Sequence, residues 1–198
     1  MATQSDQQTH DDKEARLEAS RERMNPGYTV AADVKTRLDA LWQRLQGFVT
    51  SSPKPPTMGI EHLAVLTPDP EGTADFYSNV LGMPVVEARQ ALMHPESTRV
   101  AVAVGGGSLL AFFTYPPMEQ EQKHAPVQER AGYGGLMHVA FTIERDEFRK
   151  TEVRLKERGI ECRMSDSVAF VTDPINGLVI EFMFVDHPSY LLTKSLPT

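Results

Sequence analysis

Two short stretches of this sequence share a glycine that is followed, three positions later, by a histidine. They are residues 59–65, which read GIEHLAV, and residues 135–141, which read GLMHVAF. In both stretches the histidine precedes an apolar residue, an alanine and a second apolar residue. A neutral imidazole is a common metal ligand and also a general acid or base. His62 and His138 are therefore the first candidates for chemistry in this chain.

A carboxylate interrupts an apolar segment in the second half of the chain only. Residues 107–113 (GSLLAFF) close the first half, and residues 177–183 (GLVIEFM) close the second. The second segment has Glu181 where the first has Ala111. An ionised carboxylate between bulky apolar residues is costly unless it is paired or bound to a metal ion. We therefore expect three protein ligands rather than four, with Glu181 as the third.

The repeat predicts that these three side chains meet. Two copies of one module usually pack with pseudo-two-fold symmetry, which would bring His62 and His138 to one site beside Glu181. Two imidazoles and one carboxylate leave about three positions open on an octahedral ion. This set is typical of non-haem Fe(II) enzymes that use O2, and Mn(II), Zn(II) and Ni(II) are the alternatives. Taken singly, each residue is more often an ordinary core or edge residue, so the hypothesis depends on the matched positions.

Residues 1–57 are expected to form a helical extension followed by a linker. Apolar residues recur at helical spacing from Val30 to Phe48, with Thr29 as a candidate N-cap. The proline-rich stretch at residues 50–56 cannot continue a helix, so it is interpreted as a stiff linker. The apolar stripe is expected to cover either the main domain or a partner subunit.

Residues 58–185 are expected to hold two modules, 58–115 and 135–185, each in the order strand, helix, strand, strand, strand. The predicted fold class is α+β. Alternating apolar residues indicate the strands, and helical spacing indicates the helices. The strands are expected at residues 58–66, 83–89, 99–104, 108–115, 136–143, 160–164, 168–172 and 178–185. The helices are expected at residues 73–81 and 145–158, the second with Phe148, Val153 and Leu155 facing the core.

The connection between the modules and the C-terminal tail supply the acid–base candidates. The connection, residues 115–134, is long, rich in proline and glycine, and without periodicity, which is typical of a functional or mobile loop. It contains His124 and Tyr133. The tail, residues 186–198, contains His187 and could fold over a cavity mouth. We take these three residues as the candidates for proton transfer.

Composition excludes several classes of function. The chain has 198 residues and is 40% hydrophobic, which is enough for one domain with an appendage. A formal charge of −7 argues against binding nucleic acid or an anionic membrane. No apolar run is long enough to span a membrane, and the polar N-terminal stretch does not resemble a secretory signal. With Cys162 as the only cysteine, we expect a cytoplasmic protein.

The motifs resemble those of the vicinal oxygen chelate superfamily over roughly residues 58–185. This superfamily includes glyoxalases, type I extradiol dioxygenases, methylmalonyl-CoA epimerases, and fosfomycin and bleomycin resistance proteins. The segments that carry the resemblance are residues 59–65, 76–77, 81–83, 136–141 and 173–182. The resemblance implies paired βαβββ modules that form a metal cavity, and it does not choose a reaction.

The branches of this superfamily differ in the residues that they place around the metal. Glyoxalases and the epimerases use four protein ligands, a pattern that Ala111 breaks. Extradiol dioxygenases and fosfomycin-resistance transferases use His, His and Glu at the matching positions. The extradiol branch adds a tyrosine where this sequence has Phe170 or Val171, and a histidine near Val102. The fosfomycin-resistance transferases have a threonine where this sequence has Ala64.

We therefore expect a mononuclear non-haem Fe(II) dioxygenase that acts on a small oxygenated substrate, aromatic ones included. The cavity is expected to be lined by Phe112, Phe113, Val139, Phe141, Phe182 and Phe184. The alternatives are a redox-neutral isomerase, lyase or thiol transferase, and a protein that sequesters a ligand without turnover. The resemblance also implies a homodimer. Whether the two modules pair within one chain or between two chains stays open.

Overall fold

The computed structural model describes residues 31–47, 59–91, 97–114 and 135–187, together with Gly27 and Thr57. The chain divides into two compact units, one of which comprises residues 59–187. The other contains helix α2, which spans Ala32–Gln46 and begins after Ala31 rather than after Thr29. Along α2, Val34, Leu41, Trp42 and Leu45 are exposed. None of the described helices is long and apolar enough to cross a membrane.

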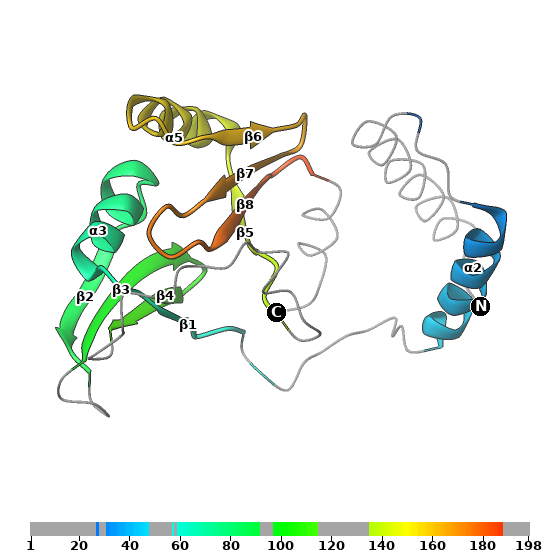
Figure 1. The fold of residues 1–198 in the computed structure, drawn as a ribbon, viewed down its shortest axis with the longest axis horizontal. Helices are drawn as coiled ribbons and strands as arrows, with labels where there is room; N and C mark the ends of the chain where they lie inside the picture. The colour runs from blue at the N-terminus through cyan, green and yellow to red at the C-terminus, as the bar shows by residue number, and fades with distance from the viewer. Residues whose placement is uncertain are drawn as a thin grey trace. The chain divides into compact units, whose positions relative to one another are not determined.

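The unit of residues 59–187 contains two four-stranded mixed sheets, as the repeat predicts (Figure 1). Sheet A has the order β1-β4-β3-β2, and sheet B has the order β5-β8-β7-β6. In each sheet the first strand of the module pairs in parallel with the last, and the other neighbours are antiparallel. Sheet A is built from β1 His62–Leu66, β2 Val85–Gln90, β3 Thr98–Gly105 and β4 Ser108–Thr114. Sheet B is built from β5 Val139–Ile143, β6 Cys162–Met164, β7 Val168–Thr172 and β8 Val179–Phe184.

The helix of the first module starts earlier than the sequence spacing predicts. It spans α3 Pro70–Asp75 and continues as a single π turn, η1 Phe76–Val80. The side chain of Asp69 accepts a hydrogen bond from the Gly72 amide, and Pro70 occupies the first helical turn. An aspartate N-cap followed by proline is a standard helix start, so this signal was present in the sequence.

Helix α5, Arg145–Glu157, agrees with the predicted bounds but buries a different set of residues. Phe148, Thr151 and Leu155 are buried, whereas Val153 is 56% exposed. The prediction for Val153 was wrong because residues 148, 151 and 155 share one side of an α-helix and residue 153 lies outside that stripe. The hydroxyl of Thr151 is satisfied by donating to the carbonyl of Leu81 at 3.2 Å.

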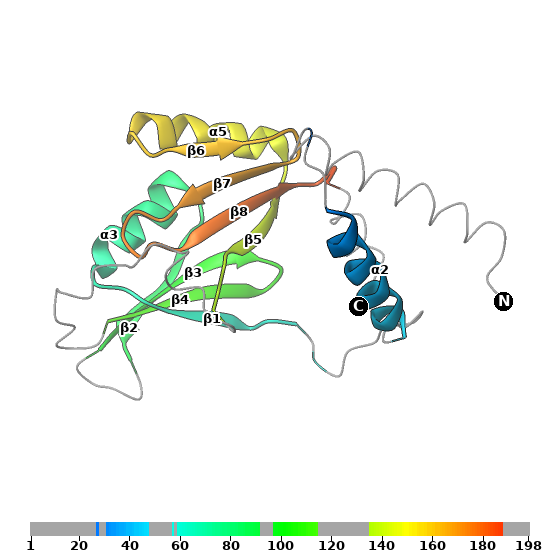
Figure 2. The same ribbon diagram turned by 45° about the vertical axis from the view of Figure 1, so that its right-hand side comes forward.

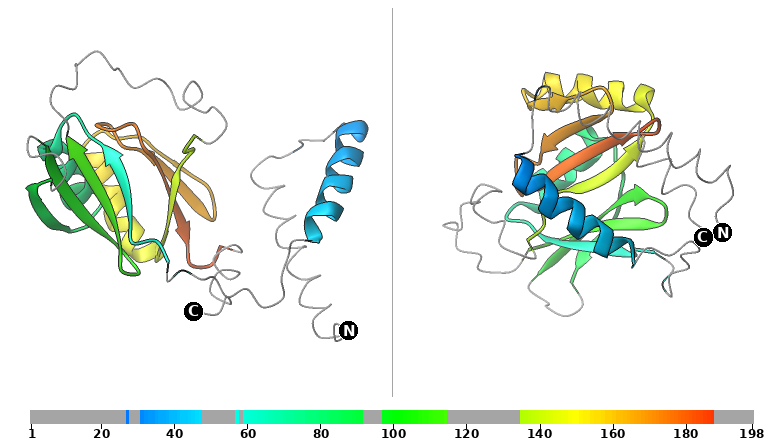
Figure 3. Two further views of the ribbon diagram at one scale, coloured as in Figure 1. Left: turned by 90° about the horizontal axis from the view of Figure 1, so that it is seen from below. Right: turned by 90° about the vertical axis from the view of Figure 1, so that its right-hand side faces the viewer.

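The two sheets share one hydrophobic core, to which both helices contribute. Tyr77 of η1 packs on Phe112 of β4, with ring centroids 4.8 Å apart. Phe148 of α5 packs on Phe182 and Phe184 of β8, with ring centroids 5.3 and 5.4 Å apart. Figure 2 shows sheet A at the bottom, sheet B above it and α5 along the top, and the view from below shows the two sheets apart from each other (Figure 3, left). One face of each sheet packs on this core. The other face, which we call the outward face, turns away from the core.

Candidate metal centre

A histidine and a glutamate meet on the outward face of sheet B. The Nε2 atom of His138 lies 3.0 Å from Oε2 of Glu181. His138 directly precedes β5, and Glu181 lies in the middle of β8. The side chain of Glu181 is only 14% exposed, and that of His138 is 39% exposed. The expected pairing of Glu181 is therefore present, with one of the two predicted histidines.

The alternation of β8 explains why Glu181 faces outward. Its neighbours Ile180 and Phe182 are both buried in the core, and successive residues of a strand point to opposite faces. In the parallel ladder, Ala140 of β5 is the register partner of Glu181. A small residue at that position leaves room beside the carboxylate.

Phe170 lies next to Glu181 and His138 on the outward face of sheet B. It is the register partner of Glu181 in β7, and its ring centroid lies 6.3 Å from that of His138, at 81°. Val171, the other residue that the sequence left open, is buried in the core. The residue beside Glu181 is therefore an aromatic ring without a hydroxyl group.

His62 lies on the outward face of the other sheet. It is the first residue of β1, its side chain is 40% exposed, and its Nδ1 atom contacts the Glu61 carboxylate. Within the residues that the structure describes, no three His, Cys, Asp or Glu side chains gather closely enough to hold a metal ion. One chain thus brings His138 and Glu181 together, and the joining of His62 to them stays a prediction.

The first module offers no carboxylate at the position matching Glu181. Ala111 is the register partner of Ala64 in β1, as Glu181 is of Ala140 in β5. The equivalence of Ala111 and Glu181 that the sequence indicated is therefore confirmed by strand register. An alanine cannot bind a metal ion, so sheet A supplies His62 alone to the predicted set.

The expected aromatic cavity is wrong in most of its members. Phe112, Phe182 and Phe184 are buried in the core, and Val139 and Phe141 pack against it. Of the six residues, Phe113 lies on the outward face of sheet A. Its register partners on that face are Leu66 in β1 and Arg99 in β3. Adjacent residues of a strand cannot share a face, so Phe182 could not line a site with Glu181.

The acid–base candidates are only partly described. His124 and Tyr133 lie outside the described residues. His187 is half-buried in the turn after β8, where its backbone N–H donates to the carbonyl of Phe184 at 2.8 Å. Its role in proton transfer remains a prediction.

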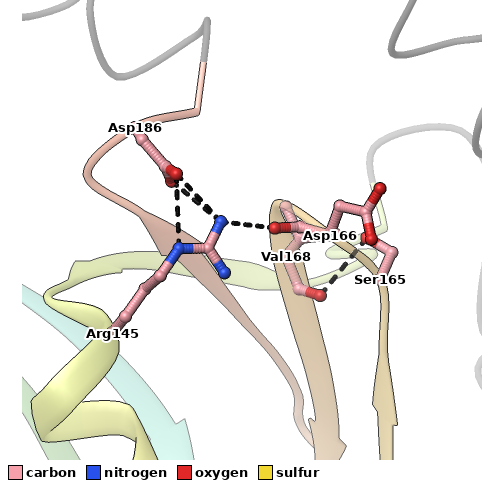
Figure 4. Close-up of polar contacts among 5 residues, drawn as sticks. All are labelled: Arg145, Ser165, Asp166, Val168 and Asp186. Carbon is pink, nitrogen blue, oxygen red and sulfur yellow. Dashed lines mark hydrogen bonds and ion pairs between the residues drawn. The ribbon is translucent and has the colours of Figure 1, made fainter.

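One arginine forms an ion pair with the turn that follows β8 (Figure 4). Arg145, at the start of α5, donates to both carboxylate oxygens of Asp186, at 2.9 and 3.1 Å, and also to the carbonyl of Asp166. Its guanidinium lies 4.3 Å from the centre of the Phe184 ring. Arg145 therefore ties the turn after β8 to the turn between β6 and β7. This contact holds the strand that carries Glu181, and nothing in the sequence pattern singled it out.

Comparison with known proteins identifies relatives over the same residues. The family model described as "Glyoxalase/Bleomycin resistance protein/Dioxygenase superfamily" matches residues 59–182. The uncharacterized protein YwkD of Bacillus subtilis (strain 168) is 27% identical over 125 residues, which cover 63% of this chain and 87% of YwkD.

Solved structures share the fold at low sequence identity. A proposed dioxygenase from Bacillus subtilis is 21% identical, with a TM-score of 0.52, over 65% of this chain. The match covers 41% of that protein, so this chain corresponds to less than half of its length. A glyoxylase/bleomycin resistance protein/dioxygenase domain from Frankia sp. EAN1pec is 15% identical, with a TM-score of 0.51, over 65% of this chain and 98% of that domain.

Proposed function

Because the chain belongs to the glyoxalase/bleomycin resistance protein/dioxygenase superfamily, we propose that it is a metal-dependent enzyme whose site is completed by two copies of the chain. The observation that carries this proposal is the pair formed by His138 and Glu181, 3.0 Å apart on a face that turns away from the core. A histidine and a nearly buried carboxylate at this distance are donors of the kind that a divalent-metal site uses.

The third ligand is His62 of a second copy. Within the described residues of one chain His62 does not join the pair, and the shared core packs on the faces of sheets A and B opposite to His62 and Glu181. If sheet A of one copy faces sheet B of another, the two outward faces enclose a site, and the dimer holds two such sites. This arrangement requires a homodimer.

The donor set fits a mononuclear divalent ion. Two imidazoles and one carboxylate suit Fe(II), and also Mn(II), Zn(II) and Ni(II), with about three positions left for substrate and O2. A bound Fe(II) would supply Lewis acidity and a path for electrons between substrate and O2. We propose a dioxygenase that acts on a small substrate with vicinal oxygens, and aromatic compounds are the first class to screen.

The residues of the chain have separate roles in this proposal. The imidazole of His138 and the carboxylate of Glu181 bind and orient the metal ion, and the contact between them sets their geometry before binding. The ring of Phe170 excludes water from one side and packs on the apolar part of the substrate. Proton transfer falls to His187, His124 or Tyr133.

A second function is favoured by one specific observation. Phe170 beside Glu181 has no hydroxyl, so the tyrosine of the extradiol pattern is missing from sheet B. A redox-neutral isomerase, lyase or thiol transferase using Mn(II), Zn(II) or Ni(II) does not need that tyrosine. Turnover without O2 consumption would select this function over the dioxygenase.

The first experiment measures metal content after anaerobic purification. We expect about one ion per chain. We also expect loss of the ion in His62→Ala, His138→Ala and Glu181→Ala, but not in Glu157→Ala, which changes an exposed carboxylate at the end of α5. Iron supports the dioxygenase, whereas zinc, manganese or nickel supports the redox-neutral reaction. Absence of metal under every loading condition would leave a ligand-sequestering protein.

A mixing experiment tests the two-copy site directly. His62→Ala and Glu181→Ala should each fail to bind metal, but a mixed dimer would contain one site with His62 from one chain and His138 and Glu181 from the other. Refolding the two variants together should therefore restore metal binding at up to one site per mixed dimer. If mixing restores nothing while each variant is folded and dimeric, the site does not form between copies.

A further inference from the structure

Two arginines face each other on the outward face of sheet A. Arg89 of β2 and Arg99 of β3 are direct partners in the antiparallel ladder. Arg99 is in turn the partner of Phe113 in β4, and its guanidinium lies 5.9 Å from the centre of the Phe113 ring. Like charges placed directly opposite each other destabilise a sheet. This position therefore favours a bridging anion.

One carboxylate bridges the pair. Nε of Arg89 lies 3.0 Å from Oε1 of Glu87, and Nη1 of Arg99 forms an ion pair with the same oxygen. The Arg99 side chain is only 11% exposed, so its charge is largely removed from water. Two guanidinium groups thus share one carboxylate oxygen, so the cluster keeps an excess positive charge. The chain as a whole has a formal charge of −7.

Counting the contacts made by the described residues, the cluster has donors to spare for a second anion. Each guanidinium offers five N–H donors in a planar fork, a geometry that matches carboxylate and phosphate oxygens. Besides Glu87, Arg89 donates to the carbonyl of Gln90 at 3.0 Å. Most donors of the pair are therefore not used by these contacts.

We propose that Arg89 and Arg99 bind an oxyanion, a carboxylate or phosphate group of the substrate, on the same face as His62. This inference rests on the proposed function, because it assigns the substrate class of that site. His62 is the register partner of Leu109 in β4, and Arg99 is the register partner of Phe113 in the same strand. Leu109 and Phe113 are four residues apart, so His62 and Arg99 lie roughly 13 Å apart in the direction of the strands. The substrate is accordingly elongated, with vicinal oxygens at one end and an anionic group at the other.

Binding of two probe anions to the metal-free protein tests this inference. Benzoate and phenyl phosphate are titrated into the full chain after chelator treatment, and binding is followed by calorimetry. We expect Arg89→Met to weaken binding by about 10-fold or more, since charge-assisted contacts are lost. Glu87→Gln should tighten binding severalfold, because the competing internal carboxylate is removed. Arg149→Met, an exposed arginine on α5, is the matched control and should bind as the wild type does.

The outcomes separate this inference from the proposed function. Because the titrations contain no metal, a chain that fails to bind metal can still show the arginine site. Tighter binding of benzoate assigns a carboxylate, and tighter binding of phenyl phosphate assigns a phosphate. If neither probe binds the wild type or Glu87→Gln, or if Arg89→Met and Glu87→Gln bind as the wild type does, the inference is overturned. Arg99 is not used as the primary test because its side chain is nearly buried.

Discussion

The hydroxyl of Tyr77 lies 3.0 Å from Oδ2 of Asp173, and both residues are buried where the two modules meet. Tyr77 belongs to the helix of the first module, and Asp173 to the turn between β7 and β8 of the second. The Oδ2 atom also accepts from Nδ2 of Asn176 at 2.7 Å, while Oδ1 accepts from the amides of Ile175 and Asn176. This buried carboxylate therefore joins the two modules through hydrogen bonds.

We expect Tyr77→Phe to lower the free energy of unfolding by about 1–3 kcal/mol, because Asp173 loses one buried hydrogen bond. The phenyl ring keeps its packing on Phe112, so the fold should be retained. Urea denaturation followed by circular dichroism measures the change. An unchanged midpoint and slope would show that this hydrogen bond contributes nothing to stability.

Alkaline pH is expected to destabilise the wild type through the same residue. Burial, and then the charge of Asp173, raises the pKa of Tyr77 far above its usual value of 10.0. The unfolded chain loses this proton near pH 10, whereas the folded chain keeps it. The contribution of the protonated Tyr77 hydroxyl to the free energy of unfolding is therefore complete below pH 10. It falls by about 1.4 kcal/mol for each pH unit above that value.

The control for the alkaline effect is Tyr77→Phe. The difference in unfolding free energy between wild type and variant should shrink as the pH rises from 9 to 11. Other groups that titrate in this range cancel in that difference. A difference that is constant with pH would contradict the assignment to Tyr77.

Helix α5 provides a matched pair of substitutions. Phe148→Ala should cost about 3–5 kcal/mol, because it removes a buried ring that packs on Phe182 and Phe184. Val153→Ala, on the exposed side of the same helix, should change stability by no more than about 0.5 kcal/mol. Thermal unfolding of both variants checks the prediction. Equal effects would mean that α5 packs differently from the arrangement described above.

Removing the metal should lower the thermal midpoint of the wild type. A ligand that binds only the folded state stabilises it by mass action, so a chelator removes that contribution. In Glu181→Gln the same chelator should have little effect, because the site has lost its carboxylate. The comparison is made by differential scanning calorimetry with and without added metal. A chelator effect of equal size in both proteins would place the metal elsewhere.

The repeat in the sequence predicted the architecture because each module carries its own apolar pattern. Pairing Ala111 with Glu181 across the repeat was enough to place both at equivalent register positions. The alternation around Glu181 also contained information that the cavity prediction did not use. An outward Glu181 requires an inward Phe182, so the aromatic residues next to it had to enter the core.

What the sequence could not predict depends on contacts between distant residues. The spacing of apolar residues defines the buried and exposed faces of a single helix or strand. It does not indicate which modules enclose a common cavity. The position of His62 relative to Glu181 depends on how the two sheets pack on one shared core. The ion pairs made by Arg145 and Arg99 likewise join segments that no local pattern connects.

The hydrogen-bonded ladders have a consequence for the route of folding. Among the described strands, each ladder closes within its own sheet, and no strand of sheet A pairs with one of sheet B. Across the described residues, the hydrogen bonds between the two modules all involve at least one side chain, such as those of Tyr77 and Asp173, which are 96 positions apart in the sequence. Forming local contacts first costs less loop-closure entropy. Each half should therefore gain its secondary structure early, and the docking of the two halves should be the late step that makes unfolding cooperative.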